Sequence, residues 1–151
     1  METDLIYLAS KLVDDQFYLL ITLFVFVGLF KFKRRDVFLL SLLLTLLFIP
    51  VLKDLYKIPR PCAGETYCPS SYGFPSIHSA VSFVFIFGAL GTPLFFIILP
   101  LGALVSFSRI YLGVHSLSQV AAGATVGMVI YLLVWIFINR FRKHFSLGEE
   151  W

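Results

Sequence analysis

Long apolar runs alternate with short polar stretches along most of the chain. Five of these runs carry little or no charge, and each is bounded by charged residues, glycine or proline. A bilayer core about 30 Å thick is crossed by roughly 20 helical residues, or by fewer where flanking lysines extend to the head groups. The pattern therefore predicts five membrane-spanning helices, at Phe17–Phe30, Asp36–Leu52, Ser76–Leu90, Thr92–Phe107 and His115–Ile138.

Two segments outside these runs have a different character. In Thr3–Val13 the apolar residues recur at helical spacing opposite polar ones. This predicts a short helix that lies in the membrane interface, since the segment is too short and too polar to span. The stretch from Lys53 to Pro75 is polar and rich in Pro, Gly and Ser, which predicts a long loop.

The composition supports the same class. Of the 151 residues, 59% are hydrophobic and only 14% are charged, and the mean hydropathy is +0.90. These values lie far outside the range of soluble domains. We therefore expect an all-α integral membrane helical bundle that forms one domain over residues 1–151. The chain shows no nucleic-acid-binding pattern, and its N-terminus does not resemble a removable signal peptide.

The basic residues predict an orientation in the membrane. They form two clusters, one after the first span and one after the last, which lie on the same side if there are five crossings. The positive-inside rule makes that side cytoplasmic, so the N-terminus of this multi-pass protein of the cell membrane is expected outside and the C-terminus inside. The two loops Lys53–Pro75 and Arg109–His115 then share the extracytoplasmic face. The clusters are Lys31, Lys33, Arg34 and Arg35, and Arg140, Arg142 and Lys143.

The segments predicted at the outer face contain residue types that bind phosphate. Lys53, Arg60 and Arg109 are cations, and a guanidinium binds phosphate oxygens in pairs without losing its proton. Taken singly, each could instead reach towards lipid head groups. Ser76 is placed to cap the third span, with His78 in its first turn, and a helix N-terminus is a natural site for an anion.

The stretch from Ser108 to Gln119 adds an imidazole beside an amide. Gln119 follows His115 by four residues, which is one helical turn. Its side-chain oxygen is expected to accept a hydrogen bond from His115 Nδ1–H, which leaves a lone pair on Nε2 to attack phosphorus. An aspartate at position 119 would also stabilise a positive charge on the ring, which an amide does not do.

Three motifs in this order resemble the signature of the type 2 phosphatidic acid phosphatase superfamily, whose pattern is K-x6-R-P, P-S-G-H and S-R-x5-H-x3-D. The resemblance covers residues 53–127 and departs from the pattern at Ile77, where glycine is usual, and at Gln119, where aspartate is usual. Dolichyl diphosphatases share both departures, and the chain is most similar in motif to that branch. The matching motifs are Lys53-x6-Arg60-Pro61, Pro75-Ser76-Ile77-His78 and Ser108-Arg109-x5-His115-x3-Gln119.

The resemblance implies an enzyme mechanism without metal or other cofactor. His115 is implied as the nucleophile that forms a phosphohistidine, His78 as the acid that protonates the leaving group, and Gln119 as the residue that holds His115. The implied phosphate-binding residues are Lys53, Arg60, Ser76, Ile77 and Arg109.

The expected reaction is hydrolysis of a polyprenyl diphosphate, of dolichyl or undecaprenyl type, to the monophosphate at the membrane surface. Within the same enzyme class, the alternative is a phosphatidate or phosphatidylglycerophosphate phosphatase. From another class, the alternative is a protein that binds or transports lipid diphosphates without cleaving them, because Gln119 replaces the usual aspartate.

Two residue pairs predict contacts within the chain or between two chains. Cys62 and Cys68 both lie in the loop predicted outside, where an oxidising compartment allows a disulfide, with two unpaired thiols as the alternative. A zinc site is not expected. Gly123 and Gly127 form a small-xxx-small pair that lets another helix approach closely, within the monomer or, as the alternative, in a homodimer.

Overall fold

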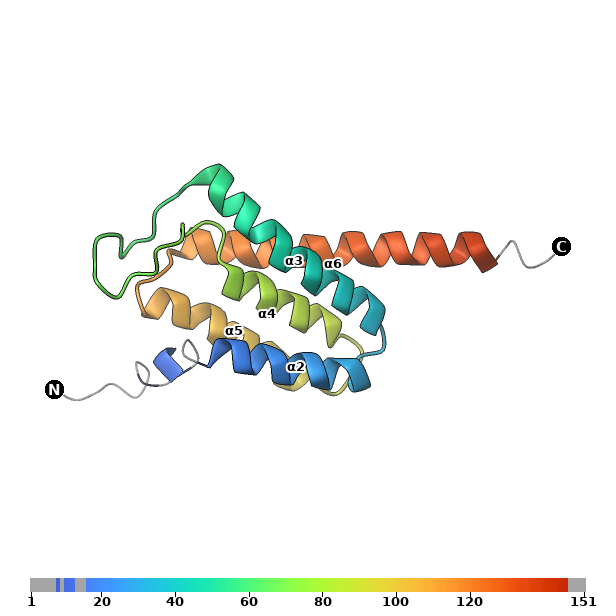
Figure 1. The fold of residues 1–151 in the computed structure, drawn as a ribbon. Helices are drawn as coiled ribbons and strands as arrows, with labels where there is room; N and C mark the ends of the chain where they lie inside the picture. Colours follow the sequence, from blue (N-terminus) through green and yellow to red (C-terminus); the bar gives the residue numbers. More distant parts are fainter. Residues whose placement is uncertain (1–7, 9, 13–15, 147–151) are drawn as a thin grey trace.

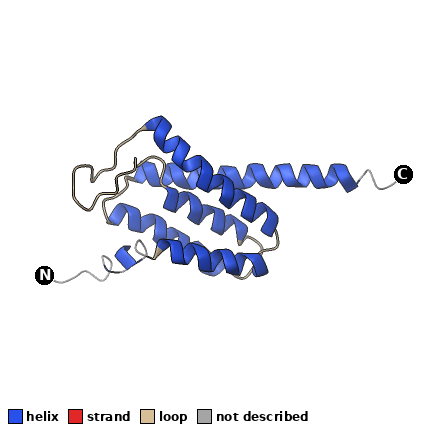
Figure 2. Ribbon diagram, viewed as in Figure 1, coloured by secondary structure: helices blue, strands red, loops and turns tan. Residues whose placement is uncertain are grey.

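The computed structural model describes residues 8, 10–12 and 16–146, without the side chains of residues 145 and 146. Residues 16–146 form five helices joined by loops, and the described residues contain no strand (Figures 1 and 2). Each predicted span corresponds to one helix. The interfacial helix predicted over Thr3–Val13 falls largely outside the described residues. The helices are α2 (Phe17–Lys31), α3 (Arg35–Tyr56), α4 (Ile77–Gly88), α5 (Phe95–Tyr111) and α6 (Leu117–Ser146).

Two predicted boundaries are wrong in ways that affect the candidate site. α3 continues through Pro50 to Tyr56, so Lys53 lies in the last turn of a helix and not at the start of a loop. α6 begins at Leu117, so His115 precedes the helix and does not start it. A capping box explains this start, because Gln119 N–H donates to Ser116 Oγ and Ser116 N–H donates to Gln119 Oε1, each over 3.3 Å.

The short helix α4 occupies the centre of the bundle and packs against α3, α5 and α6 (Figure 1). Val84 of α4 and Ala89, which directly follows this helix, are completely buried beside Val37 and Phe38 of α3. The chain reverses direction between successive helices. As a result, the C-terminal ends of α3 and α5 and the N-terminal ends of α4 and α6 lie at one end of the bundle.

Two glycines bring α6 against the backbone of α4. A Cβ atom added at Gly123 would lie 2.2 Å from the Ser76 carbonyl oxygen, and one added at Gly127 would lie 2.2 Å from the Ala80 carbonyl oxygen. The small-residue pair therefore serves close packing within the chain, as predicted. It also fixes the start of α4, which carries the Pro75–His78 motif, against the start of α6.

The opposite end of the bundle gathers the two basic clusters. Arg142 of α6 forms an ion pair with Asp36 of α3. Arg34 donates to Asn139 Oδ1 over 2.8 Å, and its guanidinium lies 5.4 Å from the centre of the Trp135 ring. These contacts join two segments more than 100 residues apart, so both clusters lie at the end of the bundle away from the long loop.

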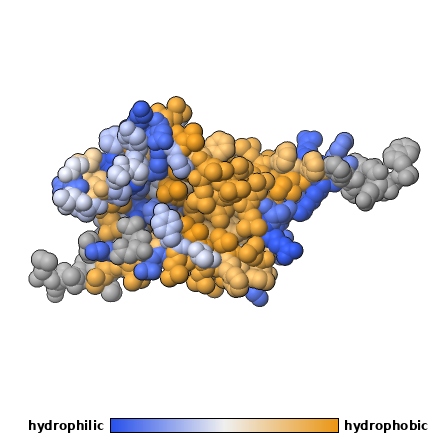
Figure 3. All heavy atoms as spheres, viewed as in Figure 1, coloured by the Kyte–Doolittle hydropathy of each residue, from blue (hydrophilic) through white to orange (hydrophobic). Residues whose placement is uncertain are grey.

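The outer surface between the two ends is apolar. Figure 3 shows a broad hydrophobic band across the helices, with hydrophilic residues gathered over the loop end and around the basic end. α3 and α6 are long and apolar enough to cross a membrane, whereas α2, α4 and α5 are apolar but shorter. Large apolar side chains on the outer faces, including Leu23, Leu47 and Phe137, are more than half exposed.

The contact between Gly127 and α4 yields a stability prediction. Gly127→Val would push side-chain carbons into the Ala80 backbone, which cannot move aside as a flexible side chain does. We expect the free energy of unfolding in detergent to fall by about 3 kcal/mol, the upper part of the usual range for overpacking. The matched control is Ala121→Val on the exposed side of α6. Equal stability of the two variants would contradict the packing described.

Candidate functional site

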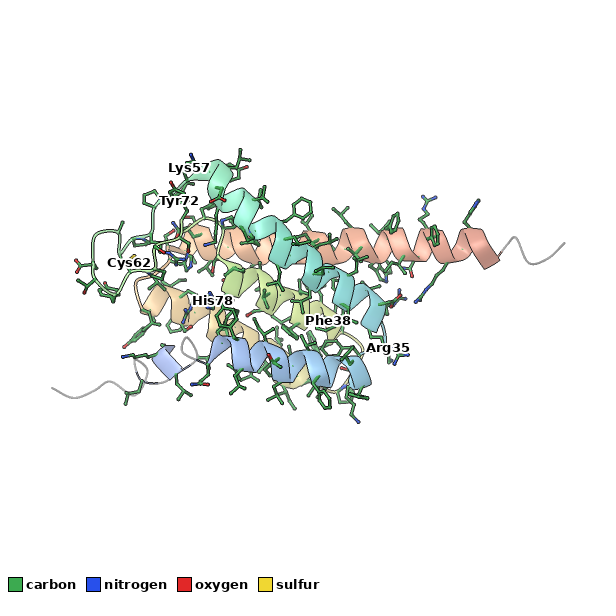
Figure 4. All side chains as sticks on the ribbon, viewed as in Figure 1. Arg35, Phe38, Lys57, Cys62, Tyr72 and His78 are labelled. Atoms are coloured by element: carbon green, nitrogen blue, oxygen red, sulfur yellow. A yellow bond between two sulfur atoms is a disulfide. The ribbon has the colours of Figure 1, made fainter. Side chains whose placement is uncertain are left out.

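All the candidate residues gather at the loop end of the bundle. Lys53 comes from the last turn of α3, Arg109 from the last turns of α5, and His115 from the connection that leads into α6. His78 lies in the first turn of α4 at the same end (Figure 4). It is close enough to Lys53, Arg109 and His115, and to Arg60 of the loop, to interact electrostatically with each.

Two backbone groups fix the orientation of the Gln119 side chain. Its Nε2 donates to the Pro59 carbonyl oxygen over 2.8 Å, and its Oε1 accepts from Ser116 N–H over 3.3 Å. A carbonyl can only accept and a backbone N–H can only donate, so the amide cannot be reversed. Gly73 packs so closely against this amide that a Cβ there would lie 2.7 Å from it.

The fixed amide determines the tautomer of His115. Gln119 Oε1 lies 3.0 Å from His115 Nδ1, and since Oε1 can only accept, Nδ1 carries the proton. Nε2 then bears the lone pair, and it lies 2.8 Å from Arg60 Nη1, which is a donor. This is the arrangement predicted for a nucleophilic imidazole, although His115 lies before the helix and not in it.

The surroundings of His115 keep its ring neutral. The side chain is 2% exposed. Burial is the main cause that lowers the pKa of His115 from 6.5 to about 4; Arg60, Lys53 and Arg109 lower it further, and the Gln119 hydrogen bond acts in the opposite direction. The imidazole therefore keeps its lone pair at neutral and mildly acidic pH.

Arg60 is held along one edge of its guanidinium by the loop and along another by the connection before α6. Nε donates to the Ser71 carbonyl oxygen over 2.8 Å, and Nη2 donates to Ser71 Oγ over 2.9 Å. Nη1, besides its contact with His115, donates to the Val114 carbonyl oxygen over 3.2 Å. One cation thereby links the long loop to the connection before α6.

The other two cations are almost completely buried. Lys53 Nζ donates to the Tyr72 carbonyl oxygen over 2.5 Å, and Arg109 donates to Ser108 Oγ from Nε over 3.2 Å and from Nη2 over 3.1 Å. Arg109 is 1% exposed. Buried cations at the end of an apolar bundle are costly and are usually functional, so these residues form a site suited to an anion.

The start of α4 is positioned by Ser76. This residue occupies the N-cap position, as predicted, and its hydroxyl makes no capping hydrogen bond with the helix. Its N–H instead donates to the Gln119 carbonyl oxygen over 3.0 Å, and its Oγ accepts from Ser79 Oγ over 3.4 Å. Ile77 follows as the first residue of the helix and is partly buried.

Cys62 and Cys68 form the predicted disulfide within the long loop. The disulfide lies between Arg60 and Ser71 in the sequence. It therefore shortens the flexible stretch of loop that connects Arg60 to Ser71, which accepts hydrogen bonds from the Arg60 guanidinium. Among the described residues, no group of three or more His, Cys, Asp or Glu side chains is placed to hold a metal ion.

Several contacts at the site were not predicted. The carbonyl groups of Pro59 and Tyr72 and the side chain of Ser71 hold the candidate residues, and the tilted ring of Phe17 of α2 packs against His78 with 3.8 Å between ring centres. The Ser-x-x-Gln spacing of the capping box at Ser116 was visible in the sequence. Backbone carbonyl contacts leave no comparable signal, because every residue has a carbonyl.

Comparison with known proteins places these features in one family. The PAP2 superfamily pattern matches residues 37–143. Dolichyldiphosphatase 1 of Dictyostelium discoideum is 37% identical over 117 residues, covering 63% of this chain and 50% of that protein. Sphingosine-1-phosphate phosphatase 1 of Mus musculus is 28% identical over 147 residues, covering 87% of this chain and 34% of that protein. The chain thus spans half or less of the length of these two relatives.

One solved structure is similar throughout most of the bundle. It is the crystal structure of the first transmembrane phosphatidylglycerolphosphate phosphatase of PAP2 type, from Bacillus subtilis. The two chains superpose with a TM-score of 0.62 at 26% identity, and the matched region covers 87% of this chain and 73% of the other.

The fixed Gln119 amide predicts the tautomer of His115 before any substrate binds. Nitrogen NMR of histidine-labelled protein at neutral pH is expected to show a protonated Nδ1 and an unprotonated Nε2. Gln119→Met keeps the length of the side chain but removes its donor and its acceptor. We expect this variant to lower the free energy of unfolding by about 1–3 kcal/mol, because the Pro59 carbonyl loses its partner. A protonated Nε2 in the unaltered protein would contradict the geometry.

The charge of Arg60 predicts how the His115 ring titrates. Arg60→Gln removes the largest cause after burial, so the pKa of His115 should rise from about 4 towards 6.5, whereas Arg60→Lys keeps the charge and should leave it low. The same NMR signals followed during acid titration measure both. Since the unfolded chain takes up this proton near pH 6.5 and the folded chain only near 4, the contribution to stability is present above 6.5 and is lost between 6.5 and 4. An unchanged pKa in Arg60→Gln would show that Arg60 does not face the ring.

Proposed function

Because the chain belongs to the PAP2 superfamily, we propose that it is an integral membrane phosphatase that hydrolyses a lipid phosphate or diphosphate through a phosphohistidine on His115. The observation that carries the proposal is the lone pair on His115 Nε2, which lies 2.8 Å from Arg60 Nη1 within a cluster of buried cations. A nucleophile beside a guanidinium is what the transfer of a phosphoryl group requires.

In the first step, Nε2 attacks phosphorus while the bond from phosphorus to the leaving oxygen breaks. Arg60, Arg109 and Lys53 stabilise the charge on the three equatorial oxygens, and the Ser76 hydroxyl and the Ile77 backbone N–H complete the anion site. The guanidinium of Arg60 exchanges its contact with Nε2 for phosphate oxygens when substrate binds. His78 gives a proton to the leaving oxygen, so the lipid product departs neutral at that atom.

In the second step, water hydrolyses the phosphohistidine on His115. His78, now lacking its proton, takes one from the water as the water attacks phosphorus. The phosphorus–nitrogen bond breaks, and its electron pair returns to His115 Nε2. Inorganic phosphate leaves and His78 is protonated again. Throughout, Nδ1 of His115 keeps its proton, which it donates to Gln119 Oε1 in a hydrogen bond. No metal takes part in either proposed step.

Gln119 acts in this scheme as a positioning residue for His115. It holds the ring but supplies no negative charge to the imidazolium that forms on attack. The negative charge of the bound phosphoryl group lies next to the ring and takes over part of that role. We therefore propose that the three cations and the orientation of Nε2 contribute most to catalysis.

We propose a polyprenyl diphosphate as the substrate. The motif residues Ile77 and Gln119 support this choice, as does the similarity to dolichyldiphosphatase 1, the relative with the higher identity of the two curated proteins described. A phosphatidylglycerophosphate is the second candidate, because the Bacillus subtilis structure that superposes on most of this chain is described as acting on that lipid.

We also propose that five helices cross the membrane with the site on the extracytoplasmic side. Both basic clusters lie at the far end of the bundle from His115, which supports a cytoplasmic position for that end by the positive-inside rule (Figure 3). The Cys62–Cys68 disulfide at the site end fits an oxidising compartment.

Phosphate release from defined lipids tests the proposed activity. Purified protein in detergent with EDTA is incubated with polyprenyl diphosphate, the matching monophosphate, and phosphatidylglycerophosphate. We expect turnover that survives EDTA and that falls by about 10³-fold or more in His115→Ala, since loss of a nucleophile removes the covalent route. His144→Ala is the matched control, because His144 lies near the end of α6 away from the site and is the remaining histidine of the three.

The outcomes separate the candidate functions. Faster release from the polyprenyl diphosphate supports the preferred substrate, and faster release from phosphatidylglycerophosphate supports the second. Tight binding of the diphosphate without any release would instead identify a protein that binds or transports it. Equal activity of His115→Ala and His144→Ala would rule out the phosphohistidine.

A further inference from the structure

An apolar groove runs from the candidate site along the side of the bundle. It lies between α2 and α5, has α4 as its floor, and encloses about 110 Å³ with almost no polar lining. Val81 and Phe85 on the floor are buried, whereas Leu101 and Leu104 on the α5 wall are about 40% exposed. The groove is therefore closed towards the protein and open sideways, towards the lipid that surrounds a membrane bundle.

The floor of the groove starts directly below His78. Val81, Ser82 and Phe85 follow His78 by three, four and seven residues, so all four side chains lie on one face of α4. A molecule that touches His78 and extends along this face enters the groove within one helical turn.

The α5 wall is aligned with Arg109 in the same way. Val105, Gly102 and Ile98 precede Arg109 by four, seven and eleven residues and share its face of α5. Gly102 has no side chain, which lets α5 pack closely against α4 at the floor of the groove; a Cβ there would lie 2.8 Å from Ile86 Cδ1. The stripe that lines the groove thus ends at a phosphate-binding cation.

The α2 wall reaches the site through Phe17. Phe17 lines the groove, and its ring also packs against the His78 ring, with 3.8 Å between ring centres and 34° between ring planes. Ile21 and Phe24 continue the wall at helical spacing. Each of the three helices therefore presents one apolar stripe, and the stripes of α4 and α5 lead back to the proposed acid and to a phosphate ligand.

We propose that the groove binds the hydrocarbon chain attached to the lipid side of the leaving oxygen. This inference rests on the proposed function, in which His78 protonates that oxygen. The group that leaves with this oxygen is the hydrocarbon chain of a monophosphate, or the remaining phosphate and hydrocarbon chain of a diphosphate. It must extend from beside His78, and the groove is the apolar path that lies there. Each helix contributes one row of side chains to the lining of the groove, and a groove of this width suits one extended hydrocarbon chain. The site therefore takes lipids with one chain, such as an isoprenoid, in preference to diacyl lipids.

Photochemical cross-linking locates the chain in the unaltered protein. The probe is a long-chain alkyl phosphonate, which is not hydrolysed, with a diazirine midway along its chain. Mass spectrometry is expected to find the label on the groove stripes of α2, α4 and α5, and an excess of unlabelled single-chain phosphate should remove it. Labels confined to α3 or to the outer face of α6 would overturn the proposal.

Filling the groove provides a test by activity. Val105→Trp is expected to lower the ratio of kcat/KM for a long-chain alkyl phosphate to that for ethyl phosphate by about tenfold, which corresponds to two displaced methylene groups. The matched control is Leu47→Trp on the exposed side of α3, which should leave the ratio unchanged. An unchanged ratio in Val105→Trp would contradict the proposal.

The two hypotheses fail in different ways. If the protein hydrolyses neither long-chain nor short-chain phosphates, the proposed function is wrong. If it hydrolyses the long-chain phosphate but the labels lie elsewhere and diacyl lipids react as fast as single-chain ones, only the groove assignment is wrong.

Discussion

The site depends on one residue, Gln119, that joins three separate parts of the chain. Its side-chain amide donates to the Pro59 carbonyl and accepts from Ser116 N–H and from His115, and its backbone carbonyl accepts from Ser76 N–H. This arrangement requires a donor and an acceptor on the same side chain. A carboxylate would hold His115 but would face the Pro59 carbonyl without a proton to share. Glutamine therefore makes contacts here that a carboxylate would not make, and it determines which imidazole nitrogen has the lone pair.

The cations around that lone pair are costly to place at the end of an apolar bundle, and the chain offsets this cost with neutral acceptors. Tyr72 and Ser71 accept from Lys53 and Arg60, and Ser108 accepts from Arg109. These neutral acceptors fix the positions of the three cations, and in the proposed mechanism the bound phosphate interacts with all three.

The sequence predicted the helices and much of the site, for physical reasons that also explain its errors. Apolar runs identify buried or lipid-facing helices directly, and the four-residue spacing of His115 and Gln119 anticipated their hydrogen bond. The ends of α3 and α6 were misplaced because they depend on local capping rather than on hydropathy. The contact between the Phe17 and His78 rings joins residues 61 positions apart, and no periodic pattern signals such a pair.

The central claim is that His115 Nε2 receives the phosphoryl group because Gln119 holds the proton on Nδ1. Rapid acid-free quenching during turnover of a radiolabelled lipid phosphate, followed by peptide mapping, locates the label directly. We expect a phosphohistidine on His115, substituted at Nε2. Label on His78, substitution at Nδ1, or full turnover without any labelled histidine would contradict the claim.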